Sequence, residues 1–129
     1  MREQQPPFTD RGFYLGPVFR RAAERHGAVF VTLDRPLDTH PALGVELTYP
    51  ALAEVVEELS GCLWEAGVRP SEQVVVHKSD NVDIVLLTCA VSRIGAVPVL
   101  LSPGLAGEVV GELIERLRQP WLGTDRAKL

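Results

Sequence analysis

Two short apolar runs separated by a segment of helix length constrain the fold of this chain more than any other feature. The runs are VVV at 74–76 and VPVLL at 97–101, and residues 81–94 between them carry apolar side chains at helical spacing. Two strands joined by a helix need a crossover connection, which makes them parallel and the unit right-handed. Strands that are apolar throughout also predict helices on both faces of the sheet. The sequence therefore predicts an α/β fold built from βαβ units.

The other segments extend this unit toward both ends of the chain. Three of them have the periodicity of amphipathic helices: 16–26, 50–66 and 105–118. Three have the composition of strands: 28–34, 44–49 and 120–125. The first two strands are joined by a long loop with two prolines, which predicts an N-terminal β-hairpin beside a largely parallel sheet with flanking helices. Residues 1–12 are expected to be a disordered or loosely attached tail, and residues 13–129 to form one domain.

The composition describes an ordinary globular protein and argues against several functions. The chain has 129 residues, of which 46% are hydrophobic and 23% charged, as suits one domain with a single core. Its net charge of −4 argues against a nucleic-acid partner, because neutralising phosphates needs a basic surface. The N-terminus has no apolar signal region, and Arg93, Gly95 and Pro98 interrupt the one long apolar run. We therefore expect a cytoplasmic protein that does not bind a membrane.

The two cysteines could form one disulfide, but their positions favour free thiols, and the histidines give no sign of a metal site. Cys62 and Cys89 fall within apolar helical patterns, so we interpret both as buried thiols in a reducing compartment. No histidine has a cysteine or histidine neighbour at the spacing of metal ligands. His40, in the proline-containing loop beside Pro41, has no evident partner.

A polar corner, HKSDN at 77–81, follows the first apolar strand, where α/β proteins often bind ligands. One interpretation is that the free N–H groups of the next helix are capped by one of three side chains: Ser79, Asp80 or Asn81. Asp83 would then add negative charge at the positive end of the helix dipole. The other interpretation is a small-ligand binder in which His77 or Lys78 touches the ligand. We favour capping, because it needs no substrate.

The rest of the sequence contains no recognisable catalytic motif. A second corner, SPGLAG at 102–107, lies at a predicted helix start but lacks the glycine spacing and terminal lysine of a phosphate-binding loop. The sequence has no Ser/His/Asp order, nucleophile elbow or paired-carboxylate arrangement.

The order of several segments resembles the N-terminal part of the AMP-forming adenylate ligases. These segments are LTYPAL (47–52), WEAGVRPSEQVVV (64–76), Asn81 opening a helix, and SRIGAVPVLLSP (92–103). The superfamily holds acyl-CoA synthetases, aryl-acid ligases, adenylation domains of peptide synthetases, and luciferases. Three departures stand out: Ala51 for the usual Glu, Ser71-Glu72 for Gly-Asp, and Pro98-Val99 for an aromatic-valine pair. The pattern GAxPV followed by Pro103 looks most like the aryl-acid ligases of bacterial secondary metabolism.

The resemblance implies a two-step reaction for the parent enzyme. A carboxylate attacks the α-phosphate of ATP, usually with Mg²⁺, and the acyl group then passes to the thiol of CoA or of a carrier phosphopantetheine. The family's phosphate loop, adenine motif, ribose-binding Asp and catalytic Lys lie downstream of the matching region. The resemblance therefore implies no catalytic, cofactor-binding or metal-binding residue and no cofactor within these residues.

We expect the 129 residues to be an N-terminal portion of such a ligase, structural and inactive by itself. The alternative is a free-standing interaction or regulatory module derived from a ligase, and the reading frame beyond Leu129 would distinguish the two. The expected partners are the remainder of the ligase, a carrier protein, and a second copy held through exposed apolar surface.

Overall fold

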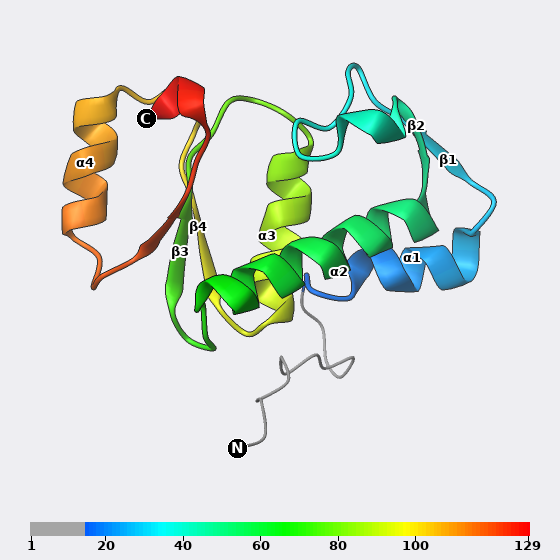
Figure 1. Cartoon of the computed structure of the whole chain (residues 1–129), viewed down its shortest axis with the longest axis horizontal. Coiled ribbons are helices and arrows are strands. Elements are labelled where there is room, and N and C mark those ends of the chain that lie inside the picture. The colour runs from blue at the N-terminus through cyan, green and yellow to red at the C-terminus, as the bar shows by residue number, and fades with distance from the viewer. Residues whose placement is uncertain (1–14) are drawn as a thin grey trace.

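The computed structural model of the chain describes residues 15–129, and its elements follow the predicted order (Figure 1). The helices are α1 (Val18–His26), α2 (Tyr49–Ala66), α3 (Asp83–Arg93) and α4 (Gly107–Glu115), with 3-10 turns at Pro41–Leu43 and Arg126–Lys128. The strands are β1 (Phe30–Thr32), β2 (Glu46–Thr48), β3 (Gln73–Val76), β4 (Val97–Leu100) and β5 (Trp121–Gly123). The predicted tail, 1–12, lies outside the described residues.

The strands form two sheets, as the hairpin and the βαβ pattern predict. β1 and β2 pair antiparallel, with Phe30 opposite Thr48. The other three strands are parallel in the order β4-β3-β5, so β3 is central. The chain passes from β3 to β4 through α3 and returns across β3 to β5 through α4. Because the two crossovers run in opposite directions across the sheet, their shared handedness places α3 and α4 on opposite faces, as Figure 1 shows. The predicted fold class is confirmed.

Helix α2 runs through the centre of the molecule, as Figure 1 shows, and packs against both α1 and α3. It begins where Thr48 Oγ1 accepts a hydrogen bond from Ala51 N at 3.3 Å, with Pro50 in the first turn. It ends at Gly67, whose φ of 111° is the left-handed conformation expected at this position. One face of α2 packs in a hydrophobic core cluster that also includes Leu37 and Leu86, both fully buried.

The expectation that both apolar strands are covered on both faces is right for β3 and wrong for β4. Val74, Val75 and Val76 are buried, whereas Val97 is 46% and Leu100 is 54% exposed. β4 is an edge strand of a three-stranded sheet, and α4, on the far face, has a single buried residue, Val110. Apolar content alone could not distinguish a strand inside the sheet from one at its edge.

Pro98 occupies a particular place on this edge. Val97 N donates to Glu72 O at 2.8 Å and Leu101 N to Val76 O at 3.1 Å, so alternate residues of β4 direct their backbone groups to β3. Pro98 lies between them and faces the open side of the sheet. Having no N–H, it leaves a gap in the row of donors there.

Candidate functional site

The polar corner is centred on Lys78, which is buried at the point where β3 ends. Its Nζ lies 2.7 Å from Asp83 Oδ1 and 3.3 Å from Asp38 Oδ2, and donates to Ser79 O at 3.0 Å. Asp83 has no exposed surface, and among the described residues its Oδ1 has no hydrogen-bond donor, so the short contact with Lys78 is an ion pair without hydrogen-bond geometry. The corner therefore holds a buried lysine between two carboxylates.

Asn81 makes the hydrogen bond to the start of α3 that one of the predicted alternatives requires, although the N-cap position itself is Val82, which has no side-chain bond of this kind. Its Oδ1 accepts from Asp83 N at 3.0 Å and also from Asp38 N at 3.3 Å, while its Nδ2 donates to Pro36 O at 3.0 Å. Asp83 Oδ2 in turn accepts from Thr39 N at 3.1 Å. The capping group is thus shared with the loop between β1 and β2, which the sequence did not reveal.

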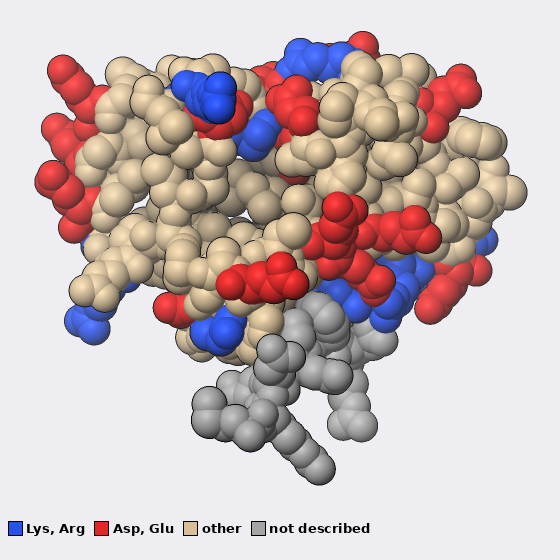
Figure 2. Space-filling view, viewed as in Figure 1, with Lys and Arg blue, Asp and Glu red and all other residues tan. Residues whose placement is uncertain are grey.

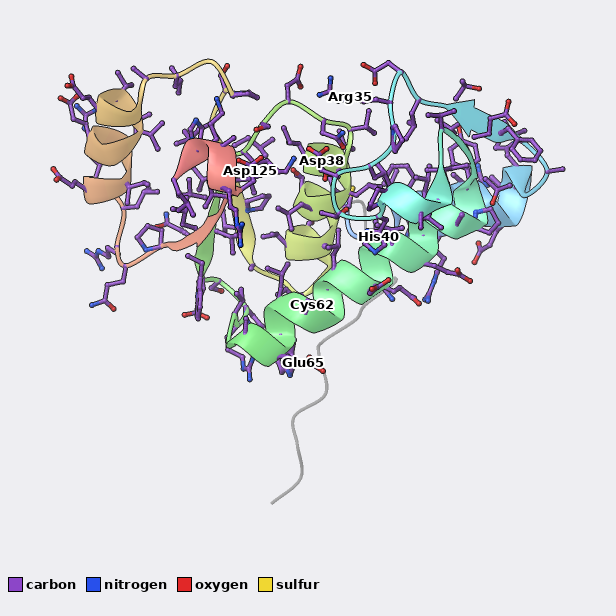
Figure 3. All side chains as sticks on the ribbon, turned by 45° about the horizontal axis from the view of Figure 1, so that its top comes forward. Arg35, Asp38, His40, Cys62, Glu65 and Asp125 are labelled. Atoms are coloured by element: carbon purple, nitrogen blue, oxygen red, sulfur yellow. The ribbon has the colours of Figure 1, made fainter. Side chains whose placement is uncertain are left out.

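Asp125 joins the corner from the other end of the chain. Its Oδ2 accepts from Ser79 N at 2.9 Å, and its Oδ1 accepts from Lys128 N at 3.2 Å. The backbone N–H of Ser79 lowers the pKa of the Asp125 carboxyl below its ordinary value, and the charge of Lys78 acts in the same direction. Figure 3 shows Asp38 and Asp125 on the side of the molecule where the chain passes from β3 to α3.

His77 is buried and its backbone N donates to Gly123 O at 2.9 Å. Its Nε2 finds no hydrogen-bond partner within residues 15–129. Neither His77 nor Lys78 lines the three best-formed grooves of the described surface. Lys78 and Asn81, in contrast, contact groups within the corner, and these contacts give the small-ligand interpretation no support.

The expectation that His40 lacks a partner is wrong. His40 Nε2 lies 3.1 Å from Glu58 Oε2, and Nδ1 lies 2.9 Å from Thr39 Oγ1. The 3-10 turn Pro41–Leu43 folds the hairpin loop back onto α2, and this return brings together side chains that are 18 positions apart. These two contacts hold the loop against the helix.

The cysteine prediction is right for one thiol only. Cys89 is buried, and burial raises the pKa of its thiol to about 11. Cys62 is exposed on α2, where Figure 3 labels it. Both are free thiols. The apolar pattern of α2 marks its buried face correctly, but Cys62 lies outside that face.

An ion-pair network connects α1, α2 and α3. Glu57 Oε1 lies 3.1 Å from Arg93 Nη2 and also pairs with Arg20 Nη2. The Arg20 side chain is 41% exposed, and this pair ties α1 to α2. Arg93, which interrupts the apolar run, is buried at the end of α3.

Residues 15–129 contain neither a cluster of metal-binding side chains nor a helix with membrane-spanning character. No three side chains among His, Cys, Asp and Glu come close enough to hold a metal ion. None of the described helices combines the length and the apolar character that a membrane span needs.

The sheet order, the helices on both of its faces and the closed corner at the strand ends define a doubly wound α/β domain. Residues 18–118 match the family described as AMP-binding enzyme, and the chain belongs to this family.

Two curated relatives show what share of a family member's length this chain covers. The chain is 52% identical to a 3-amino-2-hydroxy-4-methoxybenzoate diazotase of Streptomyces cremeus over 118 residues, which cover 92% of this chain and 21% of the relative. It is 32% identical to a 4-chlorobenzoate–CoA ligase of an Arthrobacter species over 76 residues, or 59% of this chain and 15% of the relative. The chain thus spans about a fifth or less of the length of these relatives.

Solved structures share the fold at low sequence identity. The N-terminal domain of FACL13 from Mycobacterium tuberculosis superimposes with a TM-score of 0.72 at 17% identity, covering 85% of this chain and 26% of that one. O-succinylbenzoate Coenzyme A synthetase from Bacillus subtilis, in complex with AMP, gives a TM-score of 0.71 at 16% identity, covering 84% and 26%. These likenesses agree with the α/β architecture described above.

Proposed function

We propose that the chain is the N-terminal portion of an ATP-dependent, AMP-forming ligase that adenylates a carboxylic acid and passes the acyl group to CoA or a carrier-protein thiol. The observation that carries this proposal is the match of residues 18–118 to the AMP-binding family. The 52% identical relative supports it, since the matched region covers 21% of that protein. ATP and Mg²⁺ would be required by the whole enzyme.

Within that enzyme, these residues act as scaffold and do not adenylate by themselves. Two polar side chains of the corner are engaged within it: Lys78 contacts two carboxylates, and Asn81 hydrogen-bonds to three backbone groups. Holding a triphosphate needs preorganised donors and cations that are available to the ligand. The corner satisfies its own charges and so supports a role in fixing loop positions.

The acid is proposed to be an aromatic one of the benzoate type. Both relatives described above have a substituted benzoate in their names, one as a CoA ligase and the other as a diazotase. The diazotase is the more similar of the two, which favours a second candidate function: diazotisation of an aromatic amine on such an acid, in which nitrite would supply the second nitrogen and both nitrite oxygens would leave as water.

ATP–pyrophosphate exchange tests the scaffold role directly. The purified 129-residue chain, assayed with Mg²⁺, ATP and a panel of benzoates, is expected to give no exchange above a blank. Magnesium-ATP is also expected to leave the melting temperature unchanged, whereas a ligand present at about 100 times its Kd would stabilise the fold by about 2.7 kcal/mol. Exchange by the chain alone would refute the scaffold role.

A complementation assay separates the scaffold from the alternative, a free-standing interaction or regulatory module. A version of the Streptomyces cremeus diazotase that lacks its matched residues is mixed with this chain. Restored turnover supports the scaffold role. Binding without turnover to a full-length ligase or to a carrier protein favours the interaction module.

Self-association is a separate proposal. Exposed apolar side chains lie on the two outer strands of the parallel sheet, on either side of β3: Val97 and Leu100 on β4, and Trp121 and Leu122 on β5. Exposed apolar surface of this kind favours association, so we propose a homodimer. Light scattering is expected to give twice the chain mass of 14.1 kDa, and a value of 14.1 kDa at working concentration would remove the idea. A cytoplasmic location remains a prediction.

A further inference from the structure

The roomiest of the three described grooves lies at the end of the sheet opposite the polar corner. Its cavity volume is about 580 Å³. It is lined where β3 and β4 begin, by Gln73 and Val97, and by the connection from α4 to β5, which includes Arg116 and Arg118. Since the three strands are parallel, this is the amino end of the sheet, whereas His77 and Lys78 lie at its carboxyl end.

Two guanidinium groups dominate the charge of this groove. Arg116 and Arg118 form no ion pair with any carboxylate of the described residues, although Glu112 and Glu115 precede them on α4. The one acidic residue in the lining, Glu72, already accepts the backbone N–H of Arg69 at 2.5 Å through Oε1. Blue side chains project in Figure 2 below α4, where the chain turns toward β5. The groove therefore has positive charge available to a ligand.

The backbone around the groove is held in an unusual conformation. Ser71 and Gln119 have φ angles of 68° and 44°, and they are the non-glycine residues with positive φ in residues 15–129. Both line the groove. Ser71 is held there because its N–H donates to Gly95 O at 2.9 Å. Strained positions of this kind persist where the surrounding structure fixes them, and they cluster at ligand-binding sites.

The lining also has an apolar part. Val97 is an exposed strand residue, and Leu117 is half-buried between the two arginines in sequence. A guanidinium group presents parallel N–H donors that match a carboxylate, while an apolar floor favours a ring or a short alkyl chain. We infer that this groove is a binding site for a small organic monocarboxylate with an apolar body. The site is independent of the proposed ligase function.

Benzoate is the probe, and benzamide is its uncharged counterpart of the same shape. In a titration followed by amide NMR, benzoate is expected to give saturable shifts at Ser71, Val97 and Gln119. Benzamide is expected to bind about tenfold more weakly or worse, because it lacks the charge that strengthens hydrogen bonds to a guanidinium. Inorganic phosphate is expected to bind more weakly than benzoate, since it gains nothing from Val97 and Leu117.

The variant Arg116→Gln/Arg118→Gln is expected to weaken benzoate binding by about tenfold or more. The matched control is Arg35→Gln/Arg126→Gln, which removes the same charge from two exposed arginines outside the groove and is expected to bind benzoate as the unaltered chain does. Should the first variant fail to fold, the comparison of benzoate with benzamide on the unaltered chain decides. The inference is overturned by an absence of saturable shifts, by equal losses in the two variants, or by phosphate or benzamide binding as tightly as benzoate.

Discussion

Replacing Lys78 with Met tests whether the polar corner is an ion cluster on which the fold depends. Met keeps most of the volume of the side chain but removes the charge, and Asp83 is then left fully buried without its cation. At 2.7 Å and an effective dielectric constant of about 20, the attraction between the two charges is about 6 kcal/mol, most of which offsets the cost of burying them. Breaking such a pair from one side costs about 3–5 kcal/mol. We expect this loss in the free energy of unfolding.

Urea denaturation followed by circular dichroism gives the measurement. With a slope of about 1.5 kcal/mol per molar urea, the midpoint of Lys78→Met is expected to fall by about 2–3 M. The double variant Lys78→Met/Asp83→Asn is expected to recover most of the loss, because the remaining amide oxygen can still accept from Thr39 N. The control is Lys128→Met, which removes the charge of an exposed lysine and should cost no more than about 1 kcal/mol.

Two results would refute the reasoning about the corner. One is a Lys78→Met variant within about 1 kcal/mol of the unaltered chain, which would mean that the buried pair contributes little. The other is a double variant whose loss equals the sum of the two single losses, since residues in direct contact should not act independently.

Three other predictions concern single positions. Gly67→Ala should destabilise the chain by about 1–2 kcal/mol, since its φ is 111° and the added Cβ would lie 3.3 Å from the Trp121 ring. The control Gly61→Ala lies within α2 with open space around it and should stabilise the chain by up to about 1 kcal/mol. Equal effects of the two substitutions in thermal unfolding would contradict this prediction. A thiol reagent should modify one cysteine, Cys62, in the folded chain and a second, Cys89, only in denaturant, as counted by mass spectrometry; fast double labelling would contradict the burial. Because the pKa of Asp125 is lowered in the folded state, its contribution is present above the ordinary aspartate pKa and is lost as the pH falls through the folded value. The stability advantage over Asp125→Asn should therefore shrink on acidification, and an advantage that grows would reverse the sign.

Local patterns in the sequence predicted the elements, because helix and strand periodicity are properties of neighbouring residues. The helix over Tyr49–Ala66, its proline-containing start and its glycine end are examples. The capping role of Asn81 was likewise one of three local alternatives. In each case the deciding groups lie within a few positions of one another.

Contacts between distant segments could not be predicted in this way. Lys78 meets Asp38 across 40 positions, and His40 meets Glu58 across 18, and neither pair leaves a periodic signal. The exposure of β4 was missed for a related reason: its composition matches that of β3, and only the number and order of strands make it an edge. Pairing across the chain is set by the fold as a whole.

Pro98 affects how other chains can meet this sheet. If another chain paired a strand with the outer edge of β4, the carbonyl group opposite Pro98 would find no N–H donor. Growth of a fibre by repeated strand pairing would therefore lose one hydrogen bond with every added chain. The apolar side chains of Val97 and Leu100 can still adhere to a neighbour. On this side of the molecule, apolar side chains can thus mediate association between chains while backbone pairing into a continuous sheet is disfavoured.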